Sequence, residues 1–106
     1  MNSKKNRSGQ MGVDVNKLDI LYKQAESYRL ANYWPQASAR YKECFEKDSV
    51  RFAAGLYWYA ACMRSMGRYA QADSSARESM QTAALDPALH IAATEELATL
   101  KFIREQ

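Results

Sequence analysis

The chain has 106 residues, of which 47% are hydrophobic and 25% are charged, a composition typical of one soluble globular domain. Its formal net charge of +3 arises in residues 1–13, where Lys4, Lys5 and Arg7 occur without any acidic residue. Without these three, the basic residues equal the 12 acidic ones in number, which excludes the basic face that nucleic-acid binding needs. We expect residues 1–13 to be a disordered basic tail.

The sequence offers no export signal and no membrane span. No apolar run follows the basic start of the chain. The longest uncharged apolar run, FAAGLYWYAACM at 52–63, is shorter than the about 20 residues that a membrane-spanning helix needs. We therefore expect a cytoplasmic protein in which Cys44 and Cys62 are free thiols in a reducing compartment.

Apolar residues recur at helical spacing along five segments, and no segment shows the alternation of a strand. Gly67 stands where glycine commonly ends a helix. The predicted caps are Asp14 or Asn16 for the first helix, Ser49 for the third, and Asp86, followed by Pro87, for the fifth. We predict an all-α fold of two helical hairpins and one terminal helix, over approximately residues 14–32, 35–48, 50–66, 69–84 and 87–104.

Two short stretches nearly repeat each other. NYWPQA at 32–37 and GRYAQA at 67–72 share an aromatic residue at the third place and Gln-Ala at the end, and Ala37 and Ala72 are 35 residues apart. A recurrence at this period is typical of repeat architectures. We predict that both stretches are equivalent turns that start the second helix of each hairpin, with both alanines buried where the helices cross.

The pattern resembles the tetratricopeptide repeat, a helix-turn-helix unit of about 34 residues with small and aromatic residues at fixed places. Small residues let the two helices of a hairpin approach closely, and the aromatic residues fill the adjacent space. The resemblance extends over approximately residues 18–100. The matching positions are Leu21, Ala25, Tyr28, Ala37, Tyr41 and Cys44 in the first unit, and Leu56, Ala60, Met63, Gly67, Tyr69 and Ala72 in the second.

The resemblance implies a helical hairpin stack, an α-solenoid, over residues 14–106. Its first repeat would cover about 18–49 and its second about 53–84, and the last helix, 87–104, would cap the stack. We expect this helix to turn Glu95, Glu96 and Lys101 toward water. Four positions depart from the family pattern, namely Gln24, Ser49, Ala76 and Ser79.

In the tetratricopeptide family, the first helices of successive repeats line a concave groove that holds a helical or extended segment of a partner protein. Members that grip a C-terminal carboxylate use lysine and asparagine where this chain has Tyr22 and Glu26, so that activity is not expected. Tyr57 and Trp58 could instead complete the core, and the sequence leaves this open. The implied groove residues are Asp19, Tyr22, Lys23, Glu26 and Arg29 in the first repeat and Tyr57, Trp58, Ala61 and Arg64 in the second.

Patterns for catalysis and metal binding do not occur in the sequence. His90 is the single histidine, and together with Cys44 and Cys62 it would supply at most three zinc ligands without short-range pairing. The four glycines form no phosphate-binding loop. We therefore expect no enzyme, no cofactor, no metal and no small-molecule substrate.

The sequence favours a small adaptor or chaperone that binds another protein, similar in size and fold to small bacterial secretion-system chaperones. Two alternatives stay open: a self-assembling structural module, and a weak binder of nucleic acid or an anionic surface through the basic tail. Because the central helix is apolar on all sides and a two-repeat stack covers little of it, we expect a dimer or an obligate partner complex.

Overall fold

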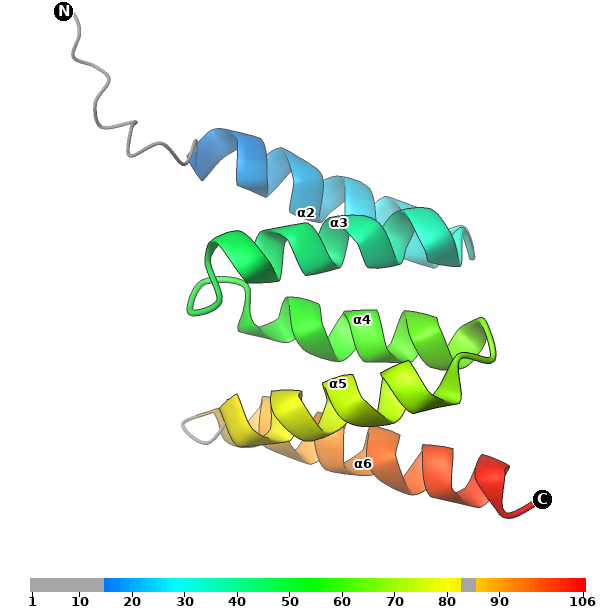
Figure 1. The fold of residues 1–106 in the computed structure, drawn as a ribbon. Coiled ribbons are helices and arrows are strands. Elements are labelled where there is room, and N and C mark those ends of the chain that lie inside the picture. The colour runs from blue at the N-terminus through cyan, green and yellow to red at the C-terminus, as the bar shows by residue number, and fades with distance from the viewer. Residues whose placement is uncertain (1–14, 83–85) are drawn as a thin grey trace, which may run out of the picture.

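The computed structural model describes residues 15–82 and 86–106, and over these ranges its regular elements are all helices (Figure 1). Each helix packs against its neighbour in sequence, and α4 also packs against α6. The predicted all-α stack of five helices is confirmed, whereas the predicted tail, Asp14 and the expected extension of the fourth helix to 84 lie outside the described residues. The helices are α2 (Val15–Leu30), α3 (Trp34–Lys47), α4 (Ala53–Ser65), α5 (Tyr69–Thr82) and α6 (Pro87–Arg104).

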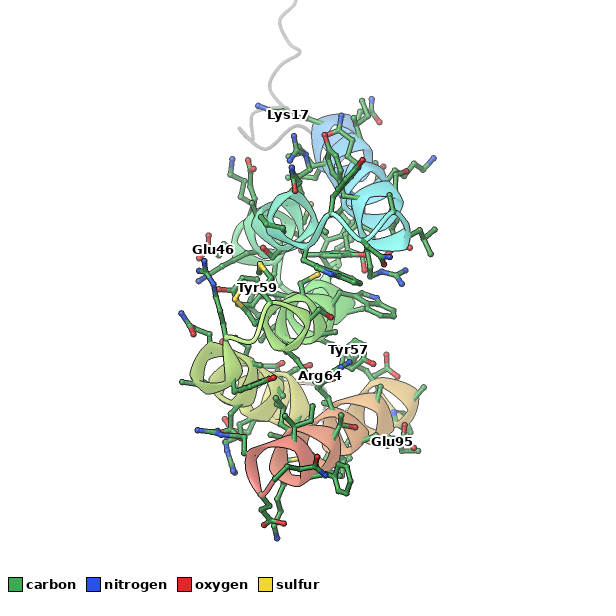
Figure 2. The ribbon with its side chains drawn as sticks, turned by 90° about the vertical axis from the view of Figure 1, so that its right-hand side faces the viewer. Lys17, Glu46, Tyr57, Tyr59, Arg64 and Glu95 are labelled. Carbon is green, nitrogen blue, oxygen red and sulfur yellow. The ribbon has the colours of Figure 1, made fainter. Side chains whose placement is uncertain are left out.

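The helices do not lie in one plane. Viewed nearly end-on in Figure 2, α3 and α5 lie on the left, α2 on the right and α4 at the centre, and α6 runs from the right toward the centre. Gly55 permits the close contact of α4 with α3, because a Cβ atom there would stand 3.0 Å from the carbonyl oxygen of Tyr41. The central place of α4 explains its sequence, since helices cover it on several sides.

The two turns predicted to be equivalent are the same structure. Asn32 and Gly67 both have positive φ, 65° and 77°, which ends the preceding helix in the left-handed conformation. Each turn is closed by the same pair of backbone hydrogen bonds, characteristic of the Schellman motif. These are Tyr33 N to Tyr28 O (2.8 Å) and Asn32 N to Arg29 O (3.0 Å) in the first turn, and Arg68 N to Met63 O (2.8 Å) and Gly67 N to Arg64 O (2.9 Å) in the second.

Small residues form the centre of the packing. Ala37 and Ala72 are fully buried, as predicted, and so are Ala25 and Ala60 on the helices they cross. Both cysteines are buried free thiols, and burial raises the pKa of Cys62 to about 11. Since the thiolate is the reactive form, this environment makes Cys62 a packing residue rather than a nucleophile.

The helix starts show where the sequence prediction was right and where it was wrong. Asp86 caps α6 through a hydrogen bond from Leu89 N to its Oδ1 (3.2 Å). Ser49 does not cap α4, which begins only at Ala53; instead Asp48 accepts a bond from Arg51 N (3.1 Å) within the preceding turn. Asn16 lies inside α2 rather than before it. Because Asp14, the other predicted cap of that helix, lies outside the described residues, only the prediction for Ser49 is wrong; there the capping residue Asp48 stands directly before it.

Candidate binding face

Two rows of side chains on α2 and α4 form the candidate binding face. On α2, Asp19, Tyr22, Glu26 and Arg29 follow at steps of three, four and three, which places them along one side of the helix. On α4, Tyr57, Ala61 and Arg64 follow at steps of four and three, with Trp58 beside them. We call these eight residues the α2–α4 face.

Arg29 joins the two rows. Its guanidinium carbon lies 3.8 Å from the ring centroid of Trp58, a cation–π contact between α2 and α4. Arg29 Nε also donates to the hydroxyl of Tyr41 (2.8 Å), and its Nη2 pairs with Glu26 Oε2 (3.3 Å). The Tyr41 hydroxyl in turn donates to Glu26 (2.5 Å). Arg29 is therefore held in place over the indole by two polar partners.

The phenols in this network stay neutral. Tyr41 is fully buried, and burial followed by its hydrogen bond to Glu26 raises its pKa. Burial, and next the charge of Glu26, raise the pKa of Tyr22 to about 12. Burial is the largest single influence on Arg29 and would lower its pKa, but the hydrogen bonds and charges of Tyr41 and Glu26 together outweigh it, so that the pKa is raised. The network thus provides one fixed cation and one fixed anion.

The second half of the face is bound to α6. Arg64 Nε donates to Glu96 Oε2 (2.5 Å), and Figure 2 shows Arg64 together with Tyr57 in the space between α4 and α6. Burial, with the charge of Glu96 as a further cause, raises the pKa of Tyr57. The expectation that Glu96 faces water is wrong: the residue is 5% exposed, because it lies on the buried side of α6 and is needed there as the partner of Arg64.

The remaining predicted residues separate into two groups. Asp19 forms an ion pair with Arg51 in the turn before α4, at one end of the face. Ala61 is half-buried between Tyr57 and Arg64 in the row. Lys23 is exposed and borders a different hollow of about 310 Å³, beside Ile20, Gln24, Ser27 and Tyr28. Lys23 therefore lies apart from the contacts that join Glu26, Arg29 and Trp58.

Tyr57 and Trp58, whose place in the groove or the core the sequence left open, are both partly exposed. Trp58 packs against a core cluster that contains Ala25 and Tyr41, and both aromatic side chains are half-buried. Their rings meet edge to face with centroids 4.8 Å apart. Trp58 thus contributes to the core, and both residues keep part of their surface exposed.

The hollows that the structure describes lie away from the α2–α4 face. One of about 670 Å³ is lined by the ends of α3 and α5 and the starts of α4 and α6. Another of about 430 Å³ lies between α5 and α6. Neither of these two hollows includes a residue of the α2–α4 face in its lining.

The two residues that bind the arginines of the α2–α4 face, Tyr41 and Glu96, were not predicted in that role from the sequence. Tyr41 was predicted only as a core aromatic, although its hydroxyl holds Arg29. Glu96 could have been found from its spacing, because Leu89, Ala93, Glu96 and Leu100 form a continuous buried stripe of α6 in which the acid is the exceptional member. A lone acid in an otherwise apolar stripe indicates a buried partner of opposite charge.

Neither the search of protein-family models nor those of curated proteins and solved structures found a match to this chain. Among the described residues, no three His, Cys, Asp or Glu side chains are grouped as a metal site would require. None of the described helices combines the length and the apolar character needed to cross a membrane.

Proposed function

We propose that the protein is a non-enzymatic binding module, a small cytoplasmic adaptor or chaperone that holds a helical or extended segment of a partner protein on its α2–α4 face. The observation that carries this proposal is the half-buried Trp58 with Arg29 fixed over it. Tryptophan, tyrosine and arginine dominate the binding energy of protein interfaces, because they bury much area at a small entropic cost.

Charge on the α2–α4 face supports orientation more than affinity. Arg29 is paired with Glu26 and Arg64 with Glu96, so the fixed charges are balanced before a partner arrives. A partner gains little from competing with these pairs, whereas Trp58, Tyr57 and Ala61 offer apolar area to its side chains. The proposed partner is therefore an amphipathic segment whose apolar residues contact α4.

The resemblance to the tetratricopeptide repeat agrees with this proposal. Two hairpins carry the same Schellman turn at an offset of 35 residues, and a side chain of each first helix takes part in the contact of Arg29 with Trp58. We infer that the chain is a degenerate two-repeat member of that architecture with α6 as its cap. The basic tail, through which an anionic surface would be bound, lies outside the described residues.

The test compares two alanine-to-arginine variants. Ala61 stands in the middle of the α4 row, whereas Ala39 is exposed on α3. Immobilised wild type and both variants are used to capture proteins from the native lysate, and the retained polypeptides are identified by mass spectrometry. We expect wild type and Ala39→Arg to retain the same polypeptides and Ala61→Arg to lose them. Equal retention by all three proteins would remove the α2–α4 face as the binding surface.

A further inference from the structure

The outer face of α6 carries a row of exposed residues. The buried stripe of α6 packs toward α4 and α5, and the opposite side of the helix presents Ile91, Glu95, Ala98 and Phe102, all of them exposed. Ile91 is 56% and Phe102 is 67% exposed. Large apolar side chains on one side of a terminal helix indicate a contact surface.

The row has the same spacing when read from either end. Its residues follow at steps of four, three and four. In an antiparallel pair of α6 helices related by a twofold axis, the row of one copy therefore lies along the row of the other. Ile91 of one copy then stands opposite Phe102 of the other. Glu95 stands opposite Ala98, a long side chain against a small one. The spacing of the row thus permits contact with a second copy of α6.

The charges beside the row are complementary too. Lys101 is exposed one turn after Ala98, so Glu95 placed over Ala98 of a second copy reaches Lys101 of that copy. Within the described ranges, neither Glu95 nor Lys101 has an ion-pair partner of its own. The hollow of about 430 Å³ between α5 and α6 includes Ala98 and Lys101 in its lining, so there is room beside these residues for Glu95 of the second copy.

We propose that the outer face of α6 is a homodimer interface in which two copies pair through antiparallel α6 helices, with Ile91 against Phe102 and Glu95 beside Lys101. The proposal is independent of the α2–α4 face, which lies on other helices. Association was expected from the sequence because the apolar central helix would be left partly uncovered. In the described part of the chain, however, the large hydrophobic residues that are exposed all lie outside α4, so the proposal places the contact on α6 instead.

The decisive test is a charge exchange followed by sedimentation velocity at low salt. We expect wild type to be a dimer. Both Glu95→Lys and Lys101→Glu should raise the dissociation constant of the dimer about tenfold or more, because each variant sets like charges against each other at both symmetry-related contacts of residue 95 with residue 101. An equimolar mixture of the two variants restores both opposite-charge contacts, so dimers should return. Single variants that dimerise like wild type, or a mixture that stays monomeric, would overturn the proposal.

A second pair of variants tests the apolar contact. Phe102→Asp should give a monomer with unchanged circular dichroism. Val50→Asp, at a residue that is 90% exposed in the connection between α3 and α4, should remain a dimer. A monomeric wild type at high concentration contradicts the proposal. So do species larger than a dimer, because α6 packing head-to-tail on α2 of another copy would form open chains.

Discussion

The two hairpins, α2–α3 and α4–α5, have an arginine at the same position of the repeat, but the two arginines have different ion-pair partners. Arg29 and Arg64 are separated by the repeat offset of 35 residues. Arg29 pairs with Glu26 in its own helix, at a position where the second hairpin has Ala61. Arg64 instead pairs with Glu96 on α6. The backbone geometry repeats, while the charge pairing moves from inside one unit to the contact between two.

The second helices of the hairpins, α3 and α5, differ in the size of the residue at one equivalent position. Tyr41 fills the first hairpin, and the equivalent residue of the second is the small Ala76. Leu100 of α6 is fully buried in the cluster of the second hairpin, which helps to fill that unit. The first hairpin therefore has a large residue of its own at this position, whereas the cluster of the second includes a residue of α6. A two-repeat stack is stable only if its last unit is closed by such a helix.

Both hairpins should unfold when the buried alanine at their helix crossing is replaced by a large charged residue. Ala37→Arg and Ala72→Arg put a large charged side chain at a fully buried helix crossing, where overpacking costs about 1–3 kcal/mol and burial of the charge more. We expect both variants to be unfolded by circular dichroism. Ala39→Arg and Ala70→Arg, at exposed positions, should melt like the parent. If only one of the buried variants unfolds, the hairpins are not equivalent.

The dependence of the second hairpin on α6 predicts a large effect of Glu96→Ala. The substitution leaves Arg64 without its partner, and since the Arg64 side chain keeps 31% exposure we expect a loss of about 2 kcal/mol in the free energy of unfolding. Glu95→Ala, next to it but exposed, should change that free energy by less than about 0.5 kcal/mol. Urea unfolding measures both. Equal midpoints would mean that α6 does not stabilise the second hairpin through this pair.

The internal network of the first hairpin predicts a smaller effect of Tyr41→Phe. The variant keeps the ring but removes the hydroxyl that donates to Glu26 and accepts from Arg29. We expect a loss of about 1–2 kcal/mol, measured by urea unfolding against Tyr33→Phe, whose ring is 56% exposed. Indistinguishable variants would show that Arg29 and Glu26 do not need the hydroxyl.

The smallest effect is expected at Ser79, the equivalent of Cys44. Cys44 Sγ contacts Leu18 O (3.5 Å), whereas the buried Ser79 hydroxyl has no hydrogen-bond partner among the described residues. Ser79→Ala removes this unsatisfied group, so we expect unchanged stability or a gain of up to about 1 kcal/mol. Ser74→Ala, at an exposed position of the same helix, is the control in the thermal melt. A clear loss at Ser79 would reveal a partner for its hydroxyl.

The helices and turns could be predicted from the sequence because the patterns that determine them involve residues close together in the chain. Helix spacing, Pro87 after Asp86, and Asn32 and Gly67 at helix ends act within a few residues, so the five helices and both turns were predicted correctly. The family resemblance also selected Tyr22, Glu26 and Arg29, which lie along one side of α2. These signals do not depend on which helices meet.

Contacts between helices could not be read in the same way. The pairing of Arg64 with Glu96 joins residues 32 apart in sequence, and it appears only once α4 and α6 are packed. The stacking of Arg29 on Trp58 likewise needs α2 beside α4. Lys23 shows the converse case, because a family pattern assigned it to the groove and its place in the helix turns it toward another hollow.

The proposed function is tested most directly at Trp58, the central apolar residue of the α2–α4 face. A segment of the captured partner protein is titrated against wild type and Trp58→Ala, with circular dichroism of both proteins. Because Trp58 is half-buried and backed by Arg29, we predict that the variant keeps its helical content and binds more weakly by about 2 kcal/mol or more. A folded variant with unchanged affinity, or one that loses its helices, would contradict the proposal.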